Sequence, residues 1–154
     1  IQNYAFHIEM EDIMTKDSID SRVALALDKH NKGYNCAQSV ACSFSDLVDL
    51  DEEAIFRITE GLGLGMGSTD GTCGAISAAA ILSGLKLSTC NLDAPNSKAD
   101  SYRSSKACMD AFKEQNKSLV CRELKGLDTQ IVLRPCNDCI ADAVKIIAER
   151  LFSE

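Results

Sequence analysis

The chain has little histidine, proline or aromatic character, and it has no tryptophan. Among its 154 residues there are 2 His and 2 Pro, and 5% of the side chains are aromatic. A Cys₂His₂ zinc site would need both histidines, His7 and His30. We expect His30 to be a partly exposed residue at a helix end rather than a base. No His-Glu-x-x-His segment, nucleophile elbow or paired-carboxylate signature stands out, so the sequence does not point to the hydrolase classes that these motifs mark.

Positive charge is also scarce. The 16 Lys and Arg residues are outnumbered by 23 Asp and Glu residues, which gives a formal net charge of -7 and a pI of about 4.8. The sequence contains no basic run and no basic patch interleaved with aromatic residues. We therefore expect no nucleic-acid partner and no attraction to an anionic membrane.

Long hydrophobic runs are missing too. The longest uncharged stretch, residues 71–85, holds about 15 residues, whereas a membrane-spanning helix needs roughly 20. The printed chain also has no basic segment followed by an apolar one, the pattern of a secretory signal. We therefore expect a cytoplasmic protein without membrane insertion.

The most unusual stretch of the chain is Gly61–Gly84. Glycine alternates with apolar residues in its first half, which a helix tolerates poorly, and the second half is uncharged and rich in Ala, Ile and Ser. The pattern predicts a tight glycine-rich loop followed by a buried helix, with Thr72 as N-cap and Cys73 in the first turn. Neither G-x-G-x-x-G nor G-x-x-x-x-G-K-[ST] fits the glycines, so phosphate binding is not expected.

The rest of the chain is patterned as capped, amphipathic helices. Apart from the central helix, we expect helices to begin near Ser18, Asn35, Asp51, Ser97 and Pro135, and the one from Ser97 to run to about Val120. Strand alternation and internal repeats are absent from the sequence. The fold class predicted is all-α: a compact bundle of about six helices with a glycine-rich loop before a buried central helix. Residues 1–17 are expected to be an N-terminal extension and residues 18–154 a single helical domain that carries the cysteines.

Eight cysteines are more than core packing requires. In an intracellular chain, cysteines in this number indicate redox chemistry or metal binding. Three of them, Cys36, Cys73 and Cys136, open predicted helices, where the helix dipole and unpaired N–H groups favour the thiolate. For Cys42, Cys90 and Cys108, burial as small hydrophobic residues is the alternative.

Cys136 and Cys139 form a C-x-x-C pair. A helical turn would bring the two sulfurs near each other, so a local disulfide is feasible. The βαβ pattern of a thioredoxin-like motif is missing, however. We expect Cys139 to be a buried neighbour of Ile140 instead.

Four segments resemble a family of redox-active proteins named for the pattern C…GCAxxG…C…C. They are Gly33-Tyr-Asn-Cys-Ala-Gln-Ser-Val40, Thr72-Cys-Gly-Ala-Ile-Ser-Ala78, Cys121-Arg-Glu-Leu124, and Cys136 with the final helix. The resemblance extends from about residue 18 to 152. It implies four hallmark cysteines, which fall on Cys36, Cys73, Cys121 and Cys136. One departure is visible, because Ala78 or Ala79 stands where the motif has glycine.

The leading functional hypothesis is a redox protein that uses paired cysteines in thiol–disulfide chemistry, in the manner of a thiol–disulfide oxidoreductase. We expect Cys73 to be the most activated thiol, with Cys36, Cys121 and Cys136 as its partners in a pairing that stays open. This hypothesis requires no cofactor. The partner would be a protein or a small-molecule thiol or disulfide, and a homo-oligomer is compatible with the Ala-rich central helix.

The alternative is a metal-binding module in which Cys36, Cys73, Cys121 and Cys136 hold zinc or an iron–sulfur cluster. The spacings of 37, 48 and 15 residues include none of the close ligand pairs usual in structural zinc sites. Under either hypothesis, the four cysteines are expected to converge at one end of the bundle. A helical interaction protein with incidental cysteines is the third alternative.

Overall fold

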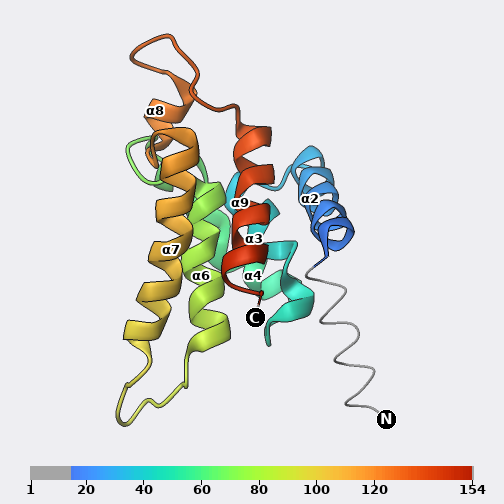
Figure 1. The fold of residues 1–154 in the computed structure, drawn as a ribbon, viewed down its shortest axis with the longest axis vertical. Coiled ribbons are helices and arrows are strands. Elements are labelled where there is room, and N and C mark those ends of the chain that lie inside the picture. Colours follow the sequence, from blue (N-terminus) through green and yellow to red (C-terminus); the bar gives the residue numbers. More distant parts are fainter. Residues whose placement is uncertain (1–14, 154) are drawn as a thin grey trace.

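The computed structural model describes residues 15–153, and within them the fold is all-α, as the sequence predicts (Figure 1). Six helices have seven residues or more: α2 (Lys16–Asn31), α3 (Cys36–Cys42), α4 (Glu52–Thr59), α6 (Gly74–Leu87), α7 (Lys98–Asn116) and α9 (Cys136–Arg150). Two shorter ones are α5 (Gly63–Met66) and α8 (Cys121–Lys125), and 3₁₀ turns lie at Ser45–Leu47 and Glu60–Leu62. Most of the expected N-terminal extension, residues 1–14, lies outside the described residues.

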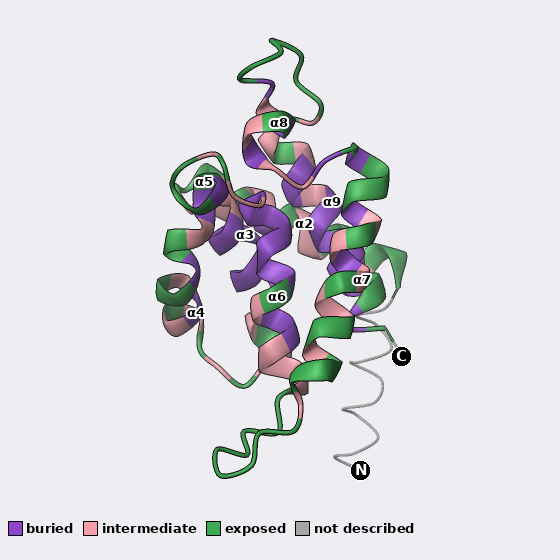
Figure 2. Ribbon diagram, turned by 90° about the vertical axis from the view of Figure 1, so that its left-hand side faces the viewer, coloured by how far each residue is buried: buried purple, intermediate pink, exposed green. Residues whose placement is uncertain are grey.

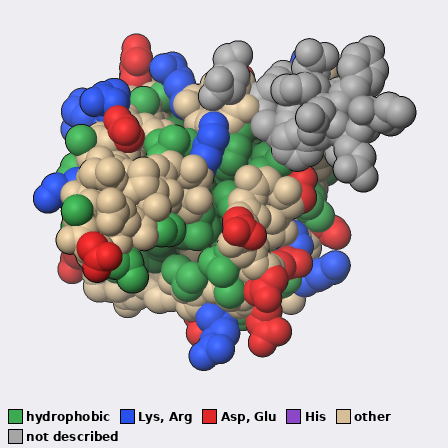
Figure 3. All heavy atoms as spheres, turned by 90° about the horizontal axis from the view of Figure 1, so that it is seen from below, with side chains coloured by type: hydrophobic (Ala, Val, Ile, Leu, Met, Phe, Trp, Pro, Cys, Tyr) green, Lys and Arg blue, Asp and Glu red, His purple; other side chains and the backbone are tan. Residues whose placement is uncertain are grey.

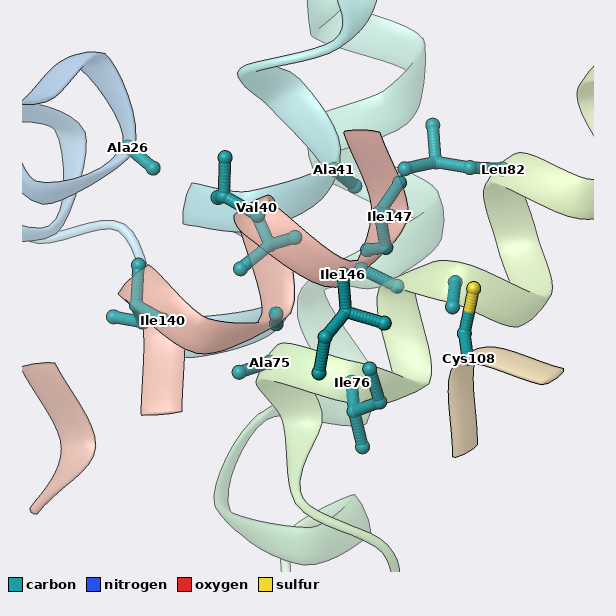
Figure 4. Packing of buried hydrophobic residues seen from close by; sticks show 14 of the residues in the cluster. Ala26, Val40, Ala41, Ala75, Ile76, Leu82, Cys108, Ile140, Ile146 and Ile147 are labelled. Carbon is teal, nitrogen blue, oxygen red and sulfur yellow. The ribbon is translucent and has the colours of Figure 1, made fainter. Parts of the chain in front are cut away.

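Helix α6 lies at the centre of the bundle, as predicted. It packs against α3, α7 and α9, and Figure 2 shows it largely buried. Its small residues let the neighbouring helices approach closely, while Ile76 and Leu82 are fully buried. Figure 4 shows these two side chains beside Ile146 and Ile147 of α9. Full burial of each such side chain stabilises the fold by about 1.5–3 kcal/mol.

Two of the predicted N-caps are confirmed. The Asn35 side chain accepts from the Gln38 N–H at 2.9 Å, and the Gln38 side chain accepts from the Asn35 N–H at 2.9 Å, which is a complete capping box. Asp51 accepts from the Ala54 N–H at 2.8 Å and caps α4. Such caps contribute about 0.5–2 kcal/mol each and fix where the chain enters its helix.

Three predicted boundaries are wrong. Helix α2 begins at Lys16 instead of Ser18, because Thr15 accepts from the Ser18 N–H and caps it. Helix α7 ends at Asn116 instead of Val120, because Lys117 adopts a left-handed conformation with φ 76°. At the start of α6 the N-cap is Cys73 instead of Thr72, and the backbone of Cys73 is non-helical, with φ -48° and ψ 126°.

One end of the bundle gathers helix starts. In Figure 1, α8 and the beginnings of α6 and α9 lie at the upper end of the molecule, while the α6–α7 connection lies at the lower end. Figure 3 views the molecule from below, where Lys, Arg, Asp and Glu side chains surround patches of hydrophobic ones. Among the described helices, none combines the length and the apolar character that crossing a membrane requires.

Candidate functional site

Each of the four hallmark cysteines stands at the beginning of a helix. Cys36, Cys121 and Cys136 are the first residues of α3, α8 and α9, and Cys73 is the N-cap of α6. The sequence predicts this position for Cys36, Cys73 and Cys136. The helix predicted from Ser97 to about Val120 would place Cys121 at or just beyond its end, whereas the chain turns at Lys117 and Cys121 opens a helix of its own. A helix start offers free N–H groups and a positive dipole end to a sulfur.

A single cavity of about 190 Å³ brings these cysteines together. Its lining consists of all four, together with Cys139, and of His30, Asn35, Leu64, Gly74, Leu124, Lys125 and Arg134. A water molecule occupies about 30 Å³ of liquid, so the cavity has room for a small reacting group beside the sulfurs. Cys36, Cys73, Cys121 and Cys136 therefore converge at this end of the bundle, as the sequence predicts.

The approach of Cys73 to Cys121 depends on an antiparallel backbone pairing. Thr72 and Val120 form an isolated β-bridge next to the two cysteines. The Cys73 N–H donates to the Leu119 carbonyl at 2.6 Å, and the Cys121 N–H donates to the Gly71 carbonyl at 3.0 Å. These bonds hold together two segments that are 48 residues apart in sequence.

The glycines of the central stretch make room for the cysteines. A Cβ on Gly74 would lie 2.5 Å from the Cys36 Sγ, and a Cβ on Gly65 would lie 2.6 Å from the Cys121 Cβ. Real Cβ atoms do not approach so closely, so any larger residue would displace a sulfur or the backbone. Gly65 also has φ 60°, between Leu64 at 57° and Met66 at 62°. This left-handed run favours glycine and turns the chain back toward Cys121.

Cys73 is the thiol that the site activates most. A hydrogen bond from the Cys139 thiol lowers the pKa of Cys73 to about 7, although burial acts in the opposite direction. The N–H groups of Ala75 and Ile76 and the positive charge of Lys125 lower this pKa further. Since its pKa lies near neutrality, Cys73 is far more ionised at pH 7 than an ordinary cysteine.

Three other cavity thiols, those of Cys36, Cys121 and Cys139, favour the neutral form. The hydrogen bond to Cys73, followed by burial, raises the pKa of Cys139 far above its usual range. Burial raises the pKa of Cys36, and burial together with the negative charge of Cys73 raises that of Cys121. The site therefore contains one activated sulfur and several protonated ones, a division typical of a nucleophile with resolving partners.

Two basic side chains border the sulfurs. The Lys125 ammonium donates a hydrogen bond to the Cys136 sulfur, which raises the pKa of Lys125. Arg134 is fixed by a two-bond ion pair with the carboxylate of Asp142, at 2.8 and 3.0 Å. Asp142 is buried, so this pair anchors the chain just before α9. Neither residue was predicted from the sequence, because a lone Lys or Arg at these positions resembles any surface cation.

Cys139 is also on this cavity, although we expected only a buried neighbour of Ile140. It is 2% exposed, so its burial is confirmed. It lines the cavity beside Cys73, however, and its thiol lowers the pKa of Cys73 through a hydrogen bond. Its Sγ also lies 3.6 Å from the Arg134 carbonyl oxygen. The C-x-x-C spacing was the available signal, since residues three apart on a helix share one side.

The remaining cysteines that the sequence singled out lie away from the cavity. Cys42 and Cys108 are buried in the core, and burial raises the pKa of each to about 11. Cys90 is exposed in the segment between α6 and α7. His30 does line the cavity, and its Nδ1 lies 2.8 Å from the Tyr34 carbonyl, so that nitrogen is the protonated one.

Metal binding needs a closer grouping of ligands than the cavity provides. Within residues 15–153, no three or more His, Cys, Asp or Glu side chains are arranged so that they could hold a metal ion. Zinc or an iron–sulfur cluster would require the four sulfurs to move inward to about 2.3 Å from a metal.

The fold and the cavity define a class: an all-α protein that collects thiols from several helix starts around one activated cysteine. Comparison with family models gives the same result. Residues 34–150 match the family described as "Putative redox-active protein (C_GCAxxG_C_C)", so the chain belongs to this family. No curated protein and no solved structure matches the chain.

Proposed function

We propose that the protein carries out reversible thiol–disulfide exchange at this cavity, with Cys73 as the nucleophile and Cys36, Cys121 and Cys136 within the same reactive group. The observation that supports it most is the gathering of five cysteines around one cavity in which a single sulfur, that of Cys73, has its pKa lowered to about 7. A thiol with a pKa near ambient pH is the best attacking group in disulfide exchange.

The reaction begins with a disulfide on a protein or small-molecule partner. The Cys73 thiolate attacks one of its sulfurs, a new S–S bond forms, and the other sulfur leaves as a thiolate. A second thiol of this chain then attacks the Cys73 sulfur and releases the remaining half of the partner. The partner gains two electrons and leaves as one thiolate, which takes a proton from water, and one thiol, which takes its proton from the second thiol of this chain. The chain then holds one disulfide. Such a cycle suits a reducing compartment such as the cytoplasm.

Counting thiols on the purified chain tests this proposal. Reduced, denatured protein should show all eight cysteines, and treatment with oxidised glutathione should remove one pair, which reductant restores. Cys73→Ser should abolish the loss, whereas Cys108→Ser, which removes a buried thiol away from the cavity, should not. Metal analysis of protein purified without chelator tests the alternative function, a metal-binding module. Stoichiometric zinc or iron, with thiols that no disulfide can oxidise, would favour the metal-binding module.

A further inference from the structure

Of the cysteines on the cavity, Cys139 has the strongest influence on the pKa of Cys73. Both side chains line the same cavity, and a hydrogen bond between the two thiols is the largest influence on the pKa of each. Cys36 and Cys121 interact with Cys73 through charge repulsion instead. Cys136 is engaged by the Lys125 ammonium. Direct contact matters because a disulfide requires the two sulfurs to come within about 2.05 Å, with their Cβ atoms about 3.5–4.5 Å apart.

The Cys139 proton has two acceptors within reach. One is the Arg134 carbonyl oxygen, 3.6 Å from Sγ, and the other is the Cys73 sulfur. A hydrogen bond to an ionised acceptor is roughly twice as strong as one to a neutral acceptor. The proton therefore points at Cys73 while Cys73 is a thiolate, and it can return to Arg134 when that charge is gone. The ion pair of Arg134 with Asp142 holds the carbonyl in place for this exchange.

We propose that Cys139, which is not one of the four hallmark cysteines, is the residue that closes the internal disulfide with Cys73. This inference rests on the thiol–disulfide function proposed above and names the resolving partner within it. Cys139 is 2% exposed and Cys73 is 7% exposed, so both sulfurs are shielded from bulk solvent. A resolving thiol that shares a cavity with the attacked sulfur and hydrogen-bonds to it needs no large movement of the helices that carry the two residues.

The steps balance without a further reactant. Cys73 thiolate attacks the partner disulfide, forms a mixed disulfide and expels one partner thiolate. The Cys73 sulfur is now uncharged, so the interaction that most firmly held the proton on Cys139 is lost. Cys139 then attacks the Cys73 sulfur, the second half of the partner leaves, and the Cys139 proton goes to that leaving thiolate. The first partner thiolate takes its proton from water, so the partner disulfide is reduced to two thiols, and Cys73 and Cys139 are oxidised to one disulfide.

The test uses the full chain and oxidised glutathione as the partner disulfide. Reduced protein is exposed to a small excess of oxidised glutathione, quenched with acid and alkylating agent, and mapped by peptide mass spectrometry. Wild type should give a peptide pair that links Cys73 to Cys139. Cys139→Ser should accumulate glutathione on Cys73 at least about tenfold over wild type, because the mixed disulfide loses its resolving thiol. Cys108→Ser, a buried thiol away from the cavity, is the matched control and should behave as wild type.

Two results would overturn the inference. The first would leave the proposed thiol–disulfide function intact, and the second would also reject that function. If wild type links Cys73 to Cys36, Cys121 or Cys136, or if it links Cys136 to Cys139, the function stands and Cys139 is not the resolving partner of Cys73. If neither a glutathione adduct nor an internal disulfide involves Cys73, the proposed function fails with it. Mapping of the unmodified chain decides the question even if the Cys139→Ser variant folds poorly.

Discussion

The sulfur of Cys36 lies against the α-carbon of Gly74, so closely that a methyl group on Gly74 would come within 2.5 Å of it. The same methyl group would be 2.9 Å from the Leu62 carbonyl oxygen, which is part of the backbone and cannot rotate away. This contact connects the first residue of α3 to the first residue of α6. It explains why the residue after Cys73 is a glycine even though glycine disfavours a helix.

Gly74→Ala is therefore expected to destabilise the protein. Overpacking in a tight interior typically costs about 1–3 kcal/mol. This cost exceeds the roughly 1 kcal/mol that replacing glycine by alanine contributes to helix stability. Gly84→Ala is the matched control, because Gly84 lies in the same helix and has no atom within 4 Å of the added methyl. That control should be neutral or stabilise the protein by up to about 1 kcal/mol. Urea unfolding of both variants measures the difference, and equal free energies of unfolding would contradict the packing account.

Alkylation should single out Cys73 near neutral pH. Only the thiolate reacts, so the labelling rate of Cys73 should rise with pH and level off above its pKa of about 7. Cys42 and Cys108, whose pKa values are about 11, should remain nearly unlabelled in the folded protein at pH 7. Limiting iodoacetamide followed by peptide mass spectrometry gives the rates. A Cys73 rate no higher than that of Cys108 on reduced protein would remove the case for an activated nucleophile.

Lys125→Met should make Cys73 less acidic. The Lys125 charge favours the Cys73 thiolate, so its removal raises the pKa of Cys73 and shifts the alkylation profile to higher pH. The shift should be smaller than that of Cys139→Ala, which removes the hydrogen bond with the largest effect on Cys73. Lys113→Met, an exposed position on α7, serves as the charge-matched control and should leave the profile unchanged. If the alkylation profile of Cys73 shifted equally in Lys125→Met and Lys113→Met, the shift would come from the change in net charge and not from the position of Lys125.

Arg134→Met should destabilise the fold. Asp142 is buried, and Arg134 provides both of its ion-pair hydrogen bonds, so the substitution leaves a buried carboxylate uncompensated. Removing one partner of a buried pair costs about 3–5 kcal/mol, and less here since the Arg134 side chain is 36% exposed. The double variant Arg134→Met, Asp142→Leu should recover part of the loss. Chemical denaturation of both variants is the measurement, and no recovery in the double variant would show that Arg134 acts through other contacts.

Much of the fold could be predicted from the sequence because local signals determine it. Asn35 and Asp51 are caps whose side chains bond within three residues, so the sequence next to them is sufficient. The uncharged, small-residue composition of α6 likewise predicts burial, which the structure confirms. The end of α7 could not be predicted, because the left-handed residue that ends it is Lys117 and not the glycine that usually marks such a position in a sequence.

The site was predicted less completely than the fold. The helix-start argument indicated Cys36, Cys73 and Cys136, the family resemblance added Cys121, and the structure brings all four to one cavity. The role of Gly74, the approach of Lys125 and the contact of Cys139 with Cys73 all depend on segments far apart in sequence. Only tertiary packing creates such contacts, and the one local signal was the C-x-x-C spacing, which places Cys139 on the same side of α9 as Cys136 without showing that Cys73 lies near it.

The most direct test of thiol–disulfide exchange at this cavity is a redox titration of the intact, metal-free chain. The protein is equilibrated in buffers with different ratios of reduced to oxidised glutathione, quenched with acid, and weighed by mass spectrometry. We predict reversible loss of two hydrogens per chain, with a single midpoint, that disappears in Cys73→Ser and persists in Cys108→Ser. A chain that keeps all its thiols at every ratio, or that gains glutathione only on the exposed Cys90, would contradict the proposed function.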